Sequence, residues 1–158
     1  MRIIFLDVDG VLNSRESWNT TCVGESNKRI DPAMCARLIH LVAETGAKIV
    51  VSSTWRLFDE HLLALKRGLY GFGLEMGTII DETVSDRRGY HGRGEEINDW
   101  VTRHEVSAFV ILDDDEDMEP HMDHLIKTTW EKGLQDEHCE AAVRLFQTQE
   151  SGVPDGNV

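Results

Sequence analysis

The length, composition and charge of the chain exclude several classes of protein. Its 158 residues suit one domain with a single core, and 41% hydrophobic residues is ordinary for a globular protein. A formal net charge of −13 argues against a broad electrostatic contact with nucleic acid, which usually needs a basic face. A local site where metal ions and a few arginines reverse the sign is still compatible with that charge.

The sequence also argues against a membrane protein and a disulfide-stabilised one. No stretch approaches the roughly 20 apolar residues of a membrane span, and the short apolar run at the N-terminus leads directly into acids, unlike a secretory signal. The cysteines Cys22, Cys35 and Cys139 are scattered and odd in number, which favours a reducing compartment. We therefore expect a cytoplasmic protein without a membrane partner, and make no prediction about its oligomeric state.

The first half of the chain alternates buried strands with amphipathic helices. Residues 2–8, RIIFLDV, form a continuous apolar run of strand length, as expected of a strand covered on both faces. The pair Asp31-Pro32 supplies an N-cap and a proline in the first turn, which predicts a helix from there to Gly46. A second buried strand is predicted at 47–53, and a helix at 58–69.

The second half continues the same alternation. A short strand is predicted at 77–84, a helix that begins near Gly94, and a buried strand at 107–115 that again ends in acids. A last strand is predicted at 124–128 and a final helix at 139–146.

This alternation predicts an α/β fold with a mostly parallel sheet. We expect one domain over residues 1–150, followed by a frayed tail at 151–158. In such sheets the ligand crevice lies at the carboxyl ends of the strands. The residues predicted to lie there are Asp7, Asp9, Ser52 and Asp113 to Asp115.

Several carboxylates in one crevice would repel one another strongly without a cation. Oxygen ligands at an open site suit Mg²⁺, which keeps several waters and commonly shares the phosphate oxygens of a substrate. Asp7 and Asp9 are two residues apart, so a regular strand would send both side chains to the same side of one phosphoryl group. Gly10 lets the backbone turn away next to the substrate.

Three strings at these strand ends resemble motifs of the haloacid dehalogenase (HAD) superfamily of phosphohydrolases. FLDVDGVLN matches the first motif, VVSSTWR fits the second, a Ser or Thr at a strand end, and ILDDD fits the fourth, paired acids after an apolar strand. The fuller strings SSTWR, RGEEINDWV, ILDDDEDM and IKTTWEKGL look like the small HAD-domain subfamily associated with nucleic-acid repair, akin to the phosphatase half of polynucleotide kinase-phosphatases. The resemblance implies a HAD-like Rossmannoid three-layer sandwich without a large cap domain.

The resemblance further implies a Mg²⁺-dependent phosphomonoesterase that works through an aspartyl-phosphate. Asp7 would attack phosphorus, which splits one difficult displacement into two easier ones. Asp9 would protonate the leaving oxygen and later deprotonate the attacking water. Ser52 would donate its hydroxyl to a phosphoryl oxygen, with Ser53 as the alternative because the end of the strand is uncertain by one residue.

The same resemblance implies a set of metal ligands. Mg²⁺ would bind Asp7, the backbone carbonyl of Asp9, and Asp113. Asp114 is expected to support this metal shell, and Asp117 is an alternative acid for the fourth motif.

The third motif needs a cation beside the nucleophile and the phosphate. Arg93 is the first choice, because a positive charge at the start of the helix GEEINDW opposes the helix dipole and so indicates a tertiary partner. Arg88 is the second choice. The alternative is that Arg93 is a surface residue paired with Glu95 or Glu96.

Aromatic residues near these motifs have two interpretations. Trp55 and Arg56 would stack a nucleotide base and hold a phosphate, or Trp55 would fill the space below a helix. Trp100 and Trp130 are predicted to belong to the core.

The short interval between the first strand and the first helix leaves room only for a flap at 14–27. An open crevice admits a large phosphorylated end, so the favoured substrate is a nucleic-acid terminus or a nucleotide, and the alternative is a small metabolite or a phosphoprotein. A non-enzymatic receiver-like module is a further alternative, with Lys127 and Thr128 in the place of its switch residues. Asp9 discriminates between them, because turnover needs an acid-base group there.

Overall fold

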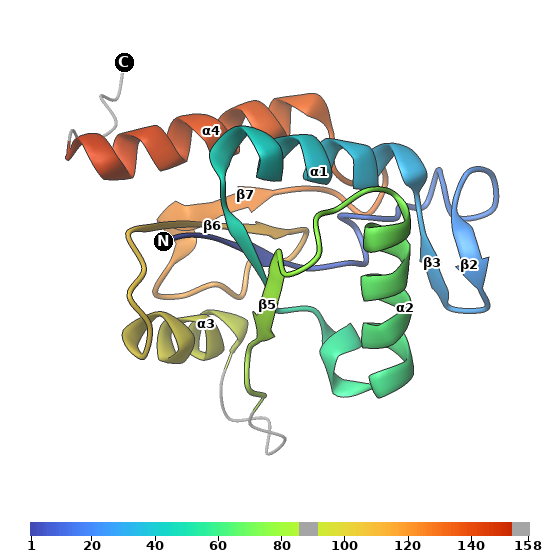
Figure 1. Ribbon diagram of the computed structural model, residues 1–158, viewed down its shortest axis with the longest axis horizontal. Helices are drawn as coiled ribbons and strands as arrows, with labels where there is room; N and C mark the ends of the chain where they lie inside the picture. Colours follow the sequence, from blue (N-terminus) through green and yellow to red (C-terminus); the bar gives the residue numbers. More distant parts are fainter. Residues whose placement is uncertain (86–91, 153–158) are drawn as a thin grey trace.

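A parallel sheet of five strands forms the middle of the fold (Figure 1). In the computed structural model, which describes residues 1–85 and 92–152, the strands lie in the order β5-β4-β1-β6-β7, and each neighbouring pair is parallel. These strands are β1 (Arg2–Leu6), β4 (Lys48–Val51), β5 (Ile79–Glu82), β6 (Ala108–Asp113) and β7 (Leu125–Lys127). The predicted α/β fold is confirmed.

The register of the central strands brings three strand ends side by side. Leu6 is paired with Val51 of β4 on one side and with Leu112 of β6 on the other. The backbone amide of Asp7 then donates to the carbonyl of Leu112 at 3.0 Å, and that of Ser52 donates to the carbonyl of Leu6 at 3.0 Å. The residues that follow the three strands therefore share one edge of the sheet.

Helices cover both faces of the sheet and make a three-layer fold. One face packs against α1 (Pro32–Thr45), α2 (Asp59–Gly71) and α4 (Asp136–Ser151), and the other against α3 (Arg93–Thr102). Figure 1 shows α1 and α4 together on one side and α3 on the opposite side. Alternate side chains of β1 pack against the helices on the two faces of the sheet, because successive side chains of a strand point to opposite faces.

The N-cap predicted for α1 is confirmed. The side chain of Asp31 accepts hydrogen bonds from the amides of Ala33 at 2.8 Å and Met34 at 3.1 Å, and Gly46 closes the helix in the left-handed conformation. On the opposite face of the sheet, the ring of Phe5 makes edge contacts at 5.6 Å with Trp100 of α3 and with Phe109.

The hairpin of β2 (Val23–Glu25) and β3 (Lys28–Ile30) was not predicted from the sequence. Its strands are three residues long, β2 is exposed and β3 buries only Ile30, so they lack the apolar pattern that marks a strand. Ile30 holds the hairpin against α2, where a Cβ on Gly68 would lie 2.6 Å from its Cδ1 atom. This hairpin and the turns before it occupy the flap predicted at 14–27.

Other boundaries and burials differ from the predictions. The first strand ends at Leu6, because the chain then turns so that the amide of Leu12 donates to the carbonyl of Val8 at 2.8 Å. Trp100 is buried as predicted, but the prediction for Trp130 was wrong, since 44% of this residue is exposed. Helix α4 continues to Ser151, and residues 153–158 of the predicted tail lie outside the described residues.

The described residues also form two short 3-10 helices, η1 (Thr54–Leu57) after β4 and η2 (Met122–His124) before β7. Within residues 1–85 and 92–152, none of the helices has the length and hydrophobicity that crossing a membrane requires.

Candidate active site

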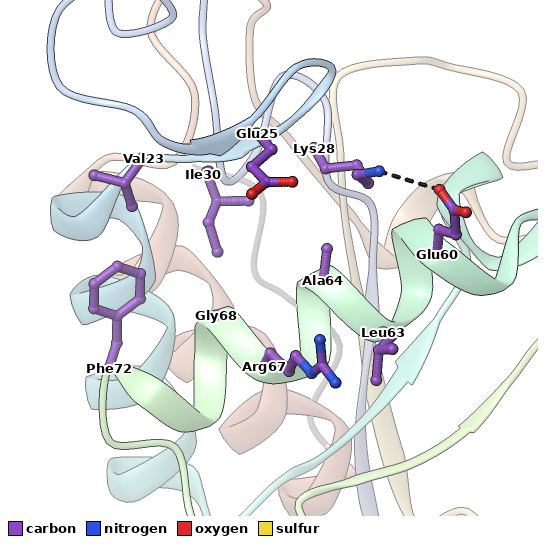
Figure 2. A pocket seen from close by; sticks show the side chains of 11 residues that line it. Val23, Glu25, Lys28, Ile30, Glu60, Leu63, Ala64, Arg67, Gly68 and Phe72 are labelled. Atoms are coloured by element: carbon purple, nitrogen blue, oxygen red, sulfur yellow. Dashed lines mark hydrogen bonds and ion pairs between the residues drawn. The ribbon is translucent and has the colours of Figure 1, made fainter.

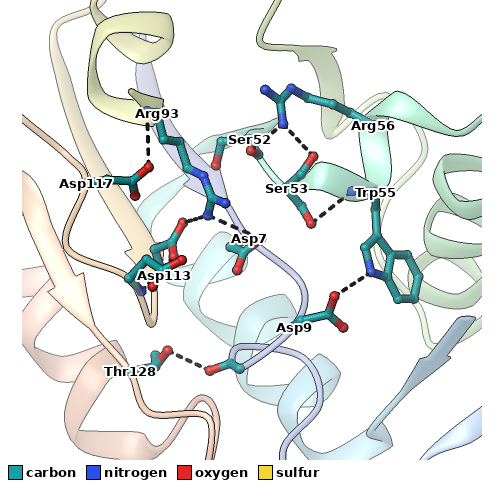
Figure 3. A network of polar contacts seen from close by, with 12 residues as sticks. Asp7, Asp9, Ser52, Ser53, Trp55, Arg56, Arg93, Asp113, Asp117 and Thr128 are labelled. Atoms are coloured by element: carbon teal, nitrogen blue, oxygen red, sulfur yellow. Dashed lines mark hydrogen bonds and ion pairs between the residues drawn. The ribbon is translucent and has the colours of Figure 1, made fainter. Parts of the chain in front are cut away.

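The carboxyl ends of β1, β4 and β6 gather the polar residues predicted from the sequence (Figure 3). Asp7 follows β1, Ser52 and Ser53 follow β4, and Asp113 is the last residue of β6. Thr128 ties two of these ends together, because its amide donates to the carbonyl of Asp113 at 2.9 Å and its hydroxyl to the carbonyl of Gly10 at 2.6 Å. The backbone amide and the side-chain hydroxyl of Thr128 therefore hold these two strand ends at a fixed spacing.

Three carboxylates form one cluster at this edge. Oxygen atoms of Asp7, Asp113 and Asp114 all lie within 4.8 Å of one another, and Asp7 and Asp113 are buried. Gly10 makes this arrangement possible: it has a φ of 79°, and a Cβ there would overlap the carboxyl group of Asp114. Asp117 is not part of the cluster; its carboxylate instead accepts a hydrogen bond from the backbone amide of Arg93 at 3.4 Å.

Arg93, the first residue of α3, is a cation that contacts the cluster. Its guanidinium group donates to the carboxylate of Asp113 and lies 3.6 Å from the Oδ1 atom of Asp7. Burial alone would lower the pKa of Arg93, but the charges of Asp7 and Asp113 outweigh it and raise the pKa. The expectation of a tertiary partner is therefore correct, whereas Arg88 lies outside the described residues.

One arginine does not neutralise the three carboxylates. Burial and the charge of Asp113 raise the pKa of Asp7 to about 7, although Arg93 and the Ser53 hydroxyl oppose the rise. Burial also raises the pKa of Asp113 and of Asp114. A bound cation would relieve the repulsion between these carboxylates, and close carboxylate oxygens are the ligands that hard divalent cations bind, so the three residues could hold a metal ion.

The carboxylate of Asp9 is held apart from this cluster by two donors. The Asn13 side-chain amide donates to its Oδ1 atom at 2.8 Å, and the indole N–H of Trp55 donates to its Oδ2 atom at 3.0 Å. Asn13 in turn accepts from the amide of Gly10 at 3.1 Å, so the turn and the carboxylate are positioned together. The side chain of Asp9 is therefore held in one orientation by Asn13 and Trp55.

The two serines after β4 differ in their surroundings. The Ser52 hydroxyl is buried and, among the described residues, is without a hydrogen-bond partner. The Ser53 hydroxyl accepts from the amide of Trp55 at 3.2 Å, and its hydrogen bond lowers the pKa of Asp7. Ser53, the alternative in the sequence analysis, is thus the serine that contacts the predicted nucleophile.

The guanidinium group of Arg56 binds backbone carbonyls and Glu96, so it is not available to bind a phosphate. Its guanidinium group donates to the carbonyls of Ser52 and Ser53 at 2.7 Å each and of Thr83 at 2.8 Å, and forms a buried ion pair with Glu96. The side chains of Arg56 and Glu96 are 5% and 9% exposed. The phosphate-binding interpretation of Arg56 was therefore wrong, and so was the pairing of Glu96 with Arg93.

Sequence reasoning missed Asn13, Glu96 and Thr128 as members of this network. Asn13 offered a signal, because it follows Asp9 by four residues within the first motif string. Glu96 and Thr128 offered none, because the side chain of each meets its partner across a separation of 40 residues or more.

A cavity of about 430 Å³ lies elsewhere, between the β2–β3 hairpin and α2 (Figure 2). Apolar side chains such as Val23, Leu63 and Phe72 line it, and Lys28 pairs with Glu60 at its rim at 3.2 Å. None of the polar residues at the three strand ends lines this cavity, so it is separate from the candidate site.

Comparison with known proteins identifies a family. The model of the family described as the HAD domain in Swiss Army Knife RNA repair proteins matches residues 3–139. The match spans all five strands of the sheet and the cluster of carboxylates. No curated protein matches the chain.

Proposed function

Because the chain belongs to the family of HAD domains in Swiss Army Knife RNA repair proteins, we propose that it is a Mg²⁺-dependent phosphomonoesterase for nucleic-acid ends or nucleotides. Membership of the family supports phosphatase activity in general. The observation that carries the finer proposal is the cluster of buried Asp7 and Asp113 with half-buried Asp114 beside Arg93, and a separately held carboxylate at Asp9.

Asp7 is the proposed nucleophile. Its carboxylate oxygen attacks phosphorus, the bond from phosphorus to the ester oxygen breaks, and the phosphoryl group is held as an aspartyl-phosphate. Arg93, 3.6 Å from Asp7, favours the ionised carboxylate and places positive charge where negative charge develops on the phosphoryl oxygens. The hydroxyl of Ser53 or of Ser52 donates to one of those oxygens.

Asp9 is the proposed acid-base group. It gives a proton to the leaving ester oxygen in the first step and takes one from water when the aspartyl-phosphate is hydrolysed. Asn13 and Trp55 each use one lone pair of the carboxylate, and each oxygen retains another lone pair for the transferred proton.

Asp7, Asp113, Asp114 and the backbone carbonyl of Asp9 would hold Mg²⁺. When bound, the ion neutralises negative charge on the nucleophile and on the phosphoryl oxygens.

The test is hydrolysis of a panel of phosphomonoesters with and without Mg²⁺. The panel contains 3′- and 5′-phosphorylated oligonucleotides, nucleotides, sugar phosphates and a phosphopeptide. We expect phosphate release from nucleic-acid ends or nucleotides that EDTA abolishes and Mg²⁺ restores, and the same panel shows which end is preferred. Release only from sugar phosphates or the phosphopeptide would overturn the proposed substrate.

Two variants test the proposed roles. Asp7→Asn is expected to abolish turnover, and Asp9→Asn to reduce kcat roughly 10²- to 10⁴-fold, the usual contribution of a positioned proton donor. Asp123→Asn removes an acid whose side chain is 80% exposed and is expected to behave like the wild type. A phosphorylated Asp7 that persists without turnover in the wild type would instead indicate a receiver-like module.

A further inference from the structure

A cleft with aromatic walls opens beside Asp9. It has a volume of about 220 Å³, and Asp9 lines it together with Trp18, Trp55, Phe58 and Trp130. Asp7, Asp113 and Arg93 do not line it. Figure 3 shows Trp55 on the side of Asp9 that lies away from Arg93 and Asp113. The cleft therefore extends the candidate site beyond the group proposed to protonate the leaving oxygen.

The walls of the cleft leave large apolar rings in contact with solvent. Trp130 is 44% exposed and Phe58 is 59% exposed. The rings of Trp18 and Trp130 face each other as a wedge, with centroids 6.5 Å apart and an angle of 52° between their planes. Exposed aromatic rings that converge beside a polar site are typical of a binding surface for a flat ligand.

The chain holds this wedge in place without a ligand. The amide of Arg15 donates to the carbonyl of Trp130 at 2.8 Å, which joins the segment before Trp18 to the loop after β7. The guanidinium group of Arg29 lies 5.8 Å from the centre of the Trp18 ring. A preformed surface binds with a smaller entropic cost than one that must be ordered.

We propose that the leaving group of the reaction carries a nucleoside next to the leaving oxygen, free or at the end of a strand, and that the base of this nucleoside stacks in the cleft on Trp130 and Trp18. The inference rests on the proposed function, because a proton donor at Asp9 places the leaving oxygen, and the alcohol that carries it, on the side of the cleft. A ribose alone would leave the aromatic rings uncovered, whereas a base has a π face for them.

The charge of the cleft limits how much of a nucleic acid it recognises. None of the eight described residues that line it is Lys or Arg, so it offers no ion pair to further phosphates along a strand. The cleft therefore selects the terminal nucleotide, and lengthening the oligonucleotide should change KM little. This agrees with a net charge of −13.

The first experiment compares two substrates that differ only in the base. One is an oligonucleotide that ends in a phosphorylated nucleotide, and the other ends in the same phosphorylated ribose without a base. We expect the wild type to have a roughly 5- to 100-fold lower KM for the first, the usual contribution of stacking one base on an aromatic side chain. Trp130→Ala should reduce this preference, because kcat/KM should fall much more for the substrate with a base than for the abasic one.

Two control variants accompany Trp130→Ala. Trp130→Phe keeps a ring and should keep most of the preference, and Phe72→Ala removes an exposed ring from α2 and should keep all of it. Equal KM values of the wild type for the two substrates, or equal losses on both in Trp130→Ala, would overturn the inference while the phosphatase activity stands. Absence of activity on both substrates would overturn the proposed function as well.

A binding measurement supplies a readout besides activity. In the Asp7→Asn protein, AMP is expected to quench the tryptophan fluorescence and ribose 5-phosphate is not, and Trp130→Ala should weaken AMP binding by the same factor as in the kinetic comparison. Quenching that is the same for both molecules would contradict stacking.

Discussion

Replacing Glu96 with alanine should destabilise the protein by about 3 kcal/mol, the lower end of the range for breaking a buried ion pair. The substitution leaves the guanidinium group of Arg56, whose side chain is 5% exposed, without a counter-charge. Three backbone carbonyls still accept its hydrogen bonds, which is why the lower end is expected. Burial already lowers the pKa of Arg56, and Glu96 opposes this effect.

The measurement is urea unfolding, with thermal unfolding as a second method. A loss of about 3 kcal/mol should lower Tm by roughly 6–12 °C for a chain of this size. Glu140→Ala is the matched control, because Glu140 also pairs with an arginine on a helix, at 3.8 Å, but both side chains are at least 66% exposed. The control should change stability by less than about 0.5 kcal/mol.

The double variant Arg56→Met with Glu96→Ala separates the charge from the packing. Because it removes both members of the pair, it should be less destabilised than the sum of the two single variants. If Glu96→Ala costs no more than Glu140→Ala, the argument from an uncompensated buried charge is refuted. The pair also bears on the site, since Arg56 holds the carbonyls of Ser52 and Ser53.

Two further predictions concern charge in the site and pH. Arg93→Met should lower kcat on the order of 100-fold, because it removes the cation between Asp7 and Asp113. The measurement is phosphate release, after circular dichroism has shown that the variant folds like the wild type. An unchanged kcat would contradict the prediction. Burial lowers the pKa of His138, although Glu137 opposes this, and its Nδ1 atom accepts from the amide of Gln135 at 2.9 Å only when unprotonated. This hydrogen bond contributes about 1 kcal/mol of stability, which should be complete above the ordinary histidine pKa and lost as the pH falls through the lowered pKa of His138. In urea unfolding, His138→Gln should therefore lose less stability on acidification than the wild type. Equal losses in the two proteins would disprove the assignment.

The sheet and its helices were predictable because their signals are local. Buried parallel strands are continuous apolar runs, and the Asp31 cap and Gly46 mark both ends of α1. The position of Asp7 and Asp113 at one edge was also predictable from the sequence, since neighbouring parallel strands end at the same edge of the sheet. The β2–β3 hairpin was not predicted, because its two short strands have no alternating apolar pattern.

The hydrogen-bond partners within the site were harder to predict, because residues far apart in the sequence meet there only in the folded structure. Trp55 and Asp9 are 46 residues apart in sequence, and the hydrogen bond between them follows only from the turn after β1 and the η1 turn after β4. Trp130 was predicted to belong to the core, but it is 44% exposed, and its loop forms hydrogen bonds with the segment that contains Arg15. Period and composition do not contain this information.

The close approach of Gly10 to Asp114 has a consequence for how such sequences diverge. Any side chain at position 10 would occupy the space of the carboxyl group at position 114, so position 10 is not free to vary while the acid at position 114 is kept. Relatives that keep the acid should keep the glycine, and those that lose the glycine should carry a shorter residue at the second position. Positions 10 and 114, although 104 positions apart, should therefore change together.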